Sequence, residues 1–350
     1  MNKITTSIYI IFFVFFSSAS TLADKRHIKI GFIYTGPVSD IGWTYSHEQS
    51  RIKLMKQYPD VETFAEKLIP PGKTEAVIEK MISKGVTAVF ATSLDYANPV
   101  KNMAQKYPGV HFFHCSGTER PSENVTTYFG RMHQPLYLAG ALASLMSKTR
   151  TIGFLGSKKV PVTKRYANAF VMGAKKTNPD IRIKILWVEE WYNPEKATEL
   201  TIDMVRDGAD VFLNGQDSAD PMRIALDNHV FAIGLNSDLS KFAPKNILTS
   251  AIWDWSVFYD IIIPHLKHGT WTGKDLWWGM EKKAVQLSPL SSFIPGNVAS
   301  HIKKSETDLM QGRFHVFAGP VYDDKGRLRI AKGKFPTDNE LLKMDWTVQY

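Results

Sequence analysis

The chain has 350 residues, a formal net charge of +9 and one cysteine, Cys115. This length is enough for two domains of ordinary size, and a single cysteine excludes an intrachain disulfide framework. The lysines and arginines are spread along the chain in short doublets, which favours a solvated basic surface over a nucleic-acid-binding patch.

Residues 1–23 are typical of a secretory signal peptide. Lys3 gives a short basic head, residues 8–16 form an apolar run that is too short to span a bilayer, and Ala23 ends a small-residue cleavage site. An uncleaved membrane anchor is the alternative. Export of a chain without disulfides suggests the periplasm of a bacterium, so we expect a cleaved, periplasmic protein.

Strand-like and helix-like segments alternate along the rest of the chain. Apolar segments predict strands at residues 27–34, 86–93, 110–116, 125–130, 151–157, 181–188, 210–215, 230–236, 247–253 and 284–288. Amphipathic or apolar segments predict helices at residues 43–58, 73–84, 97–107, 134–148, 163–177, 194–207, 218–228, 255–267 and 297–311. Asn193 and Pro194 supply an N-cap and a first-turn proline for one of these helices.

This alternation predicts an α/β fold built from doubly wound parallel sheets. About ten strands are too many for one open sheet, so we expect two lobes, each with its own sheet. The break falls near residues 130–134, where no Gly/Ser linker occurs, so several strand-like crossovers should form the hinge. We expect an N-terminal lobe of residues 24–132 plus 251–285 and a C-terminal lobe of residues 133–250 plus 286–350.

Polar and aromatic residues follow most of the predicted strands. Ligands of open parallel sheets bind beyond the carboxyl ends of the strands, so these residues are candidates for a cleft between the lobes. The main candidates are Trp43, Ser93, Tyr96, Trp191, Asp217 and Asp238. A second group consists of Asp40, Phe129, Gln216, Asn236 and Trp253.

These residue types suit a planar heterocycle. Stacking of Trp43 or Trp191 on such a ring is worth about 1–3 kcal/mol per face, and carboxylates and amides pair with the polar edge of a base. Packing in the core is the alternative for each tryptophan and is favoured for Trp187, which points inward from a strand. For Asp217 and Asp238, capping of the following helices is the alternative.

No metal, cofactor or catalytic site is predicted. His111, His114 and Cys115 resemble metal ligands, but strand alternation places His114 on the opposite face from the other two. The chain contains no GxSxG, HExxH or paired-cysteine motif.

Five segments together resemble the basic membrane protein (BMP) family of substrate-binding proteins of ABC importers. In chain order they are KIGFIYTGPVSDIGW, ATSLDYANP, YFGRMHQPLYLAGALAS, FLNGQDS and GLNSDLSKFAPKNILTSAIWDW. The resemblance implies the fold of a type I periplasmic binding protein. Such a protein is a non-enzymatic, two-lobed receptor that closes on a small molecule, mostly a purine nucleoside in this family, and delivers it to a permease in the inner membrane. A subgroup with GWTY, here residues 42–45, and a Trp-x-Tyr/Phe-x-Pro turn, here near Trp191, is associated with free purine bases such as adenine.

Two departures from the nucleoside receptors of this family bear on the ligand. Those receptors usually carry an aspartate and a lysine, suited to ribose hydroxyls, where this chain has Asn236 and, approximately, Trp253. The resemblance therefore implies a smaller, flatter ligand. The lipid-attachment cysteine common in the family is also absent, which fits a soluble periplasmic form.

The sequence thus predicts a periplasmic, monomeric solute-binding protein that captures an adenine-like purine base for an ABC importer. A nucleoside or sugar receptor of the same fold is the main alternative. A sensor subunit is another. An enzyme such as a secreted nucleoside hydrolase would need an aspartate cluster for a metal or an acid/base pair, and neither motif is found.

Overall fold

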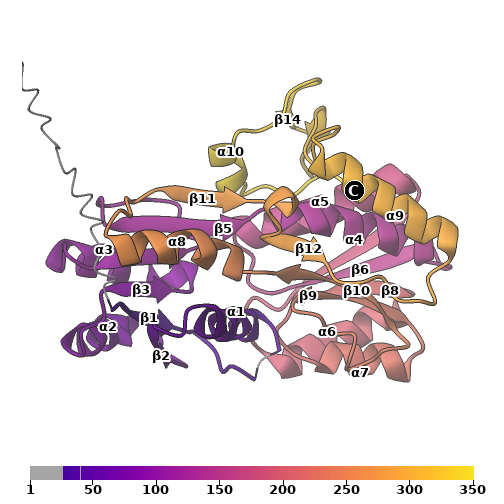
Figure 1. Ribbon diagram of the computed structural model, residues 1–350. Helices are drawn as coiled ribbons and strands as arrows, with labels where there is room; N and C mark the ends of the chain where they lie inside the picture. Colours follow the sequence, from indigo (N-terminus) through magenta and orange to yellow (C-terminus); the bar gives the residue numbers. More distant parts are fainter. Residues whose placement is uncertain (1–26, 40) are drawn as a thin grey trace, which may run out of the picture.

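Two six-stranded sheets organise the chain (Figure 1). This computed structural model describes residues 27–39 and 41–350. The predicted signal peptide, residues 1–23, and the predicted site residue Asp40 lie outside the described residues. Strands alternate with helices in both halves, which confirms the expected α/β fold with two parallel-sheet lobes.

The first sheet is parallel throughout, with the strand order β11-β5-β4-β3-β1-β2. Its strands are β1 Lys29–Ile33, β2 Glu62–Glu66, β3 Ala88–Ala91, β4 His111–Cys115, β5 Val125–Gly130 and β11 Asp275–Trp278. Its helices are α1 Trp43–Gln57, α2 Thr74–Ser83, α3 Ala97–Lys106 and α8 Ser256–His268, with the short 3-10 turns η1 Pro71–Lys73 and η2 Leu94–Tyr96.

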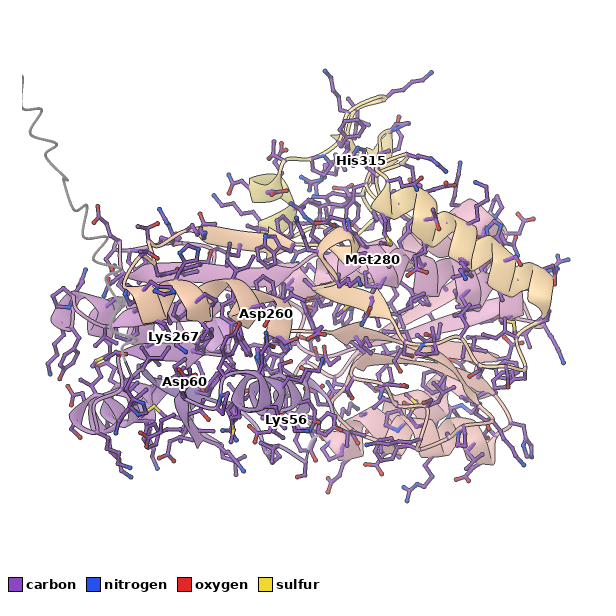
Figure 2. All side chains as sticks on the ribbon, viewed as in Figure 1. Lys56, Asp60, Asp260, Lys267, Met280 and His315 are labelled. Carbon is purple, nitrogen blue, oxygen red and sulfur yellow. The ribbon has the colours of Figure 1, made fainter. Side chains whose placement is uncertain are left out.

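The helices of this first lobe cover both faces of its sheet. Alternate side chains of β3 show this, because Val89 lies in the cluster under α2 and α3, whereas the ring of Phe90 lies 5.0 Å from that of Tyr259 on α8. Helix α8 comes from late in the chain, and an ion pair between Lys267 and Asp60 fastens it beside the end of α1 (Figure 2).

The second sheet has the order β12-β10-β9-β8-β6-β7 and is parallel except for β12. Its strands are β6 Thr151–Gly156, β7 Arg182–Trp187, β8 Val211–Asn214, β9 Phe231–Asn236, β10 Ile247–Trp253 and β12 Val285–Leu287. Its helices are α4 His133–Met146, α5 Pro161–Thr177, α6 Pro194–Arg206, α7 Asp220–Asp227 and α9 Gly296–Met310. The chain ends with the hairpin β13 Val321–Tyr322 and β14 Leu328–Ile330, followed by α10 Asp338–Leu342.

Helices α4 and α5 approach each other closely because glycine stands at two contact points. A Cβ atom at Gly140 would lie 1.9 Å from the carbonyl oxygen of Phe170, and one at Gly173 would lie 1.9 Å from that of Tyr137. Only glycine fits at such distances, so these two residues fix how α5 lies over the sheet.

The chain crosses between the sheets three times: after β5, after β10 and, through the 3-10 turn η3 Met280–Lys282, after β11. We call these three crossings the hinge. The crossings are tied together, since Arg131 N–H donates to the carbonyl oxygen of Trp278 (2.7 Å), and Met280 N–H donates to Oε1 of Gln134 (2.8 Å). The N–H group of Asp254 likewise donates to the carbonyl oxygen of Ala284 at 3.1 Å.

The strands refine the lobe boundaries that the sequence suggests. Residues 251–253 pair with β9 or β12 in the second sheet, so the second crossing follows Trp253 rather than residue 250. Val285 also pairs within the second sheet. We therefore interpret the first lobe as ending near Gly130 and resuming with α8.

Two strands of the first sheet are absent from the sequence-based prediction. The edge strand β2 has five half-buried residues and no apolar run, and β11 is only four residues long. Edge strands need less apolar surface than central ones, so their sequences carry a weak signal. None of the helices in the described ranges is long and apolar enough to cross a membrane.

Candidate ligand-binding site

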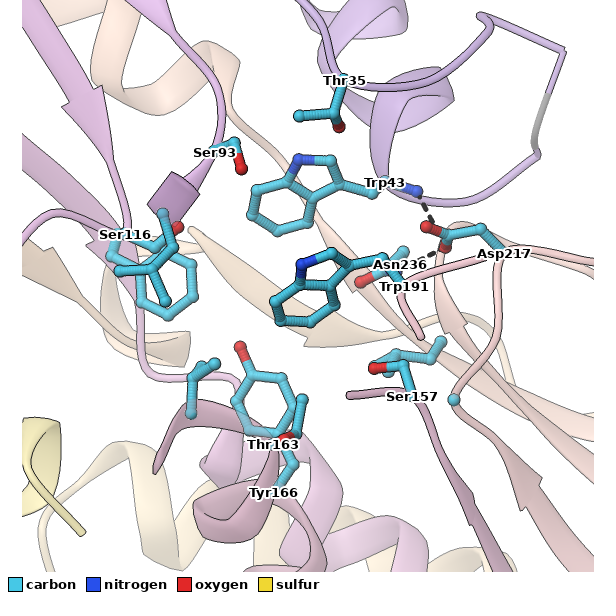
Figure 3. Close-up of a pocket in the computed structure, with 15 residues that line it drawn as sticks. Thr35, Trp43, Ser93, Ser116, Ser157, Thr163, Tyr166, Trp191, Asp217 and Asn236 are labelled. Carbon is cyan, nitrogen blue, oxygen red and sulfur yellow. Dashed lines mark hydrogen bonds between the residues drawn. The ribbon is translucent and has the colours of Figure 1, made fainter. Parts of the chain in front are cut away.

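A cavity of about 120 Å³ lies where the two sheets face each other (Figure 3). Its walls come from loops that follow parallel strands of both sheets and from the start of α5, which is where an open α/β sheet is expected to bind a ligand. The lining residues are Thr35, Trp43, Ser93, Leu94, Ser116, Phe129, Ser157, Val162, Thr163, Tyr166, Trp191, Gly215, Asp217, Leu235 and Asn236.

Trp43, the first residue of α1, forms the wall on the first lobe. Its indole N–H donates to the carbonyl oxygen of Thr92 at 2.8 Å. Its ring packs edge-on against Trp253 and Trp255, with centroid distances of 5.6 and 5.2 Å. Trp255 is fully buried and stacks on His47 (4.2 Å), so the orientation of Trp43 is fixed by a rigid aromatic cluster.

Asp217 joins the lobes at the cavity. Its Oδ1 accepts a hydrogen bond from the backbone N–H of Trp43 (3.0 Å) and one from Nδ2 of Asn236 (2.8 Å). Gly42, the N-cap residue of α1, has no capping side chain, so a carboxylate from the other lobe meets the first turn of this helix. The sequence-based alternative is that Asp217 caps the helix that follows it. Its Oδ1 instead accepts hydrogen bonds from Trp43 and Asn236.

Asn236 is held in place by Trp253. The indole N–H of Trp253 donates to Oδ1 of Asn236 at 2.9 Å, which leaves the amide nitrogen to face Asp217. Trp253 therefore lies directly behind the cavity lining. It orients a residue of the wall instead of forming the wall itself.

Trp191 forms part of the wall on the second lobe. It lies in the loop between β7 and α6, its side chain is 37% exposed, and its indole N–H donates to Oδ2 of Asp95 on the first lobe at 3.0 Å. Gln216 braces this loop, because its Nε2 donates to the carbonyl oxygen of Glu190 (3.0 Å) and its Oε1 accepts from the N–H of Asn193 (3.2 Å). Gln216 is thus a support of the loop and does not line the cavity.

Ser93 and Phe129 line the cavity as the sequence suggests. The hydroxyl of Ser93 accepts a hydrogen bond from the N–H of Asp95 (3.1 Å), which shapes the turn after β3. The ring of Phe129 lies 6.3 Å from that of Trp43 and 5.1 Å from that of Trp253, so it extends the same aromatic cluster along the cavity.

Tyr96 and Asp238, both predicted in the main group, do not line the cavity. Tyr96 is fully buried, and its hydroxyl donates to the carbonyl oxygen of Ile69 at 2.6 Å, so it belongs to the core under α2 and α3. Asp238 is exposed, and its Oδ1 accepts from the N–H of Ser240 at 3.0 Å. Its carboxylate stabilises a turn on the rim of the second lobe.

The main residue that the sequence does not indicate is Tyr166, on the second turn of α5. Figure 3 shows its hydroxyl directed into the cavity from below Trp191. Burial raises the pKa of Tyr166, so the hydroxyl stays protonated and can donate as well as accept. Ser157, by contrast, directly follows β6 and is a residue that the strand-end rule could have found.

The cavity therefore combines aromatic surfaces with hydroxyls, one carboxylate and one amide. Such a lining suits a small, flat, polar molecule. His114, considered as a metal ligand, has Nε2 2.8 Å from the carbonyl oxygen of Ser93, and burial lowers its pKa. Within residues 27–39 and 41–350, no three His, Cys, Asp or Glu side chains are grouped so that they could hold a metal ion.

Comparison with known proteins identifies the family. The model of the Bmp family, described as ABC transporter substrate-binding protein PnrA-like, matches residues 27–313. A purine-binding protein of Brucella abortus (strain 2308) is 33% identical over 326 residues, which cover 93% of each chain. A Haloferax volcanii protein that carries the name of an ABC transporter glucose-binding protein is 30% identical over 301 residues, 86% of this chain and 77% of that one.

The solved structures agree on the fold. An ABC transporter solute-binding protein from Aeropyrum pernix K1 superimposes with a TM-score of 0.72 at 14% identity, covering 92% of this chain and 100% of that one. The chain thus belongs to the Bmp family of ABC transporter substrate-binding proteins, which are typically extracytoplasmic receptors that bind small molecules, work with a membrane permease and are not enzymes.

Proposed function

We propose that this protein captures a free purine base, adenine or a close analogue, in the cavity between its lobes and delivers it to an ABC importer. The observation that carries the proposal is the pairing of Trp43 and Trp191, one from each lobe, at a small cavity that also holds Asp217 and Asn236. Stacking faces with a polar edge are what a planar heterocycle requires.

The size of the cavity favours a base over a nucleoside. Its volume of about 120 Å³ is comparable with that of the engineered cavity of roughly 150 Å³ that takes up benzene. A ring system of one or two rings suits such a space better than a base that carries a ribose.

The residues at the two positions that depart from nucleoside receptors also favour a base. Both polar groups of the Asn236 side chain are engaged inside the protein, one by Trp253 and the other by Asp217. Trp253 itself lies outside the lining and brings no cation to it. Hydroxyl groups of a sugar would therefore find fewer partners here than in a site with an aspartate and a lysine. The Brucella abortus relative, named as purine-binding, supports the same ligand class.

We further propose that the mature protein is a periplasmic monomer released by cleavage after Ala23, and that its partner is a permease of the inner membrane. N-terminal sequencing of the secreted form tests the cleavage. Adenine uptake by cells that lack the protein, compared with complemented cells, tests the transport role. Unchanged uptake would favour the sensor alternative.

The ligand is tested by calorimetry on protein that has been stripped of bound molecules by unfolding and refolding. Adenine, hypoxanthine, adenosine, ribose and glucose are titrated in parallel, with thermal unfolding as a second readout, because a ligand of the folded state raises the midpoint by mass action. Binding of adenine at least tenfold tighter than adenosine supports the proposal. Tighter binding of adenosine, or binding of glucose alone, contradicts it and supports the corresponding alternative.

A further inference from the structure

Residues 314–350 follow the part of the chain that the family model matches, residues 27–313. We call this segment the C-terminal strap. It contains the hairpin β13–β14 and helix α10 (Figure 1). Figure 2 shows His315 of the strap on the same side of the molecule as Met280 of the third crossing.

The strap is fastened to α5 by buried hydrogen bonds. Arg165, which is 1% exposed, donates through Nη1 to the carbonyl oxygen of Leu341 at 2.6 Å. Asn168, which is fully buried, donates to the carbonyl oxygen of Trp346 and accepts from the N–H of Val348, both at 2.9 Å. Polar groups buried in this way are costly to separate from their partners, so the strap moves with α5.

The same strap also contacts the hinge. Arg131, at the first crossing, pairs with both carboxylate oxygens of Asp338 on α10, at 2.9 and 2.7 Å. The Arg131 guanidinium lies 4.3 Å above the ring of Trp277 on β11, and the Arg165 guanidinium lies 5.5 Å from the same ring. The ring of Trp277 in the first sheet thus lies close both to a cation of the crossing and to a cation of the second lobe.

Near this ion pair the strap and the crossing do not pack tightly. A groove of about 400 Å³ separates them, and Arg131, Gln134, Glu281 and Asp338 are among its lining residues. The two-pronged pair between Arg131 and Asp338 bridges this groove. A two-pronged ion pair of this kind fixes the relative orientation of the two side chains as well as the distance between them.

Helix α5 connects the strap to the ligand cavity. Its first two turns contribute Val162, Thr163 and Tyr166 to the lining, and Arg165 is the neighbour of Tyr166 in the sequence. We infer that the strap is a positioning element for ligand binding: by joining α5 to the first crossing, it favours the arrangement in which the lobes are closed. Arg131 and Asp338 are its positioning residues. The inference goes beyond the proposed ligand, because it holds for any molecule on which the lobes close.

The test is the substitution Asp338→Asn, with Asp345→Asn as the matched control. Both substitutions remove one negative charge from the strap. The Asp345 side chain is exposed, however, and the Lys164 ammonium donates its hydrogen bond to the backbone oxygen of Asp345, which the substitution leaves in place. We expect Asp338→Asn to weaken adenine binding about two- to fivefold, through faster dissociation, while Asp345→Asn binds like the parent. In the absence of ligand, small-angle scattering should give a larger radius of gyration for Asp338→Asn only.

Two results would overturn the inference. One is equal affinity and equal scattering for the two variants. The other is a lower unfolding midpoint for Asp338→Asn with unchanged affinity and scattering, because the strap would then only stabilise the second lobe. Failure of the parent protein to bind adenine would refute the proposed ligand instead, and the scattering of the ligand-free variants would still decide about the strap.

Discussion

The two walls of the cavity present an aromatic ring in different ways. Trp43, on the first lobe, is held by a carbonyl oxygen of its own lobe and by the ring cluster around Trp255. Trp191, on the second lobe, lies in a loop, is more than one-third exposed and gives its N–H to a carboxylate of the opposite lobe. The ring of the first wall is therefore oriented largely by groups of its own lobe. The second wall is completed when the lobes meet, so the two tryptophans should contribute differently to affinity and to rates.

The largest effect is expected from Trp43→Ala. Loss of a stacking face costs about 1–3 kcal/mol, so adenine affinity should fall by roughly 5- to 150-fold in a calorimetric titration. Trp187→Ala is the matched control, because Trp187 is a half-buried tryptophan of β7 that packs on Phe154 and does not line the cavity.

Both alanine variants should unfold at a lower temperature, since both remove a packed ring. Only Trp43→Ala should lose affinity. If the two variants bind adenine equally well, the first wall is not a stacking surface.

Gly42→Ala should weaken binding about tenfold without touching the ring of either tryptophan. A Cβ atom at residue 42 would lie 1.8 Å from Oδ1 of Asp217, so the lobes could not meet as they do here. The variant would lose the hydrogen bond from Trp43 N–H to this charged acceptor.

Gly72→Ala is the control for this substitution, because a Cβ atom there meets nothing within 4 Å. Calorimetry and the scattering of the ligand-bound proteins should separate the two variants. Parent-like affinity for Gly42→Ala would show that the contact between Asp217 and the start of α1 is not needed when ligand is bound.

A smaller effect is expected from Trp191→Phe, which keeps a ring but removes the N–H group that Asp95 accepts. Affinity should fall about two- to fivefold, mainly through faster dissociation measured by stopped-flow fluorescence. Asp95→Ala, which removes the acceptor, should act similarly, and the double variant should be no worse than either single one, because both changes remove the same contact. Tyr192→Phe, at an exposed neighbour, should dissociate like the parent. Additive losses in the double variant would contradict a direct coupling across the cleft.

The contrast between the walls also explains what the sequence could reveal. Periodicity predicted most helices and central strands, because their buried faces repeat in a regular way. The strand-end rule then placed Trp43, Ser93 and Asp217 at one edge, since parallel strands bring their carboxyl ends together. Tyr166 escaped that rule because it comes from a helix, and its place depends on how closely α5 packs on α4.

Long-range pairing limited the prediction as well. Strand β11 pairs with β5, which lies far earlier in the chain. The four residues of β11 contain no sequence pattern from which this partner could be predicted. The sequence places Tyr96 at the cleft, whereas the structure places it in the core because of a local turn. The 3-10 turn η2 follows Ser93 and rotates Tyr96 into the core, where its hydroxyl reaches Ile69.

The smallest effect is expected from Asp238→Asn. This substitution tests whether Asp238 contributes to binding, as its position in the sequence, similar to that of Asp217, suggests. Asp217 and Asp238 each follow a strand of the second sheet, but Asn236 has a positive φ of 73° that turns the chain, so Asp238 lies exposed on the rim. An asparagine can still accept the hydrogen bond from the N–H of Ser240, so affinity should stay within about twofold of the parent. A tenfold loss in calorimetry would mean that this rim turn enters the cleft when ligand is bound, and the second wall would then include residues that lie outside it here.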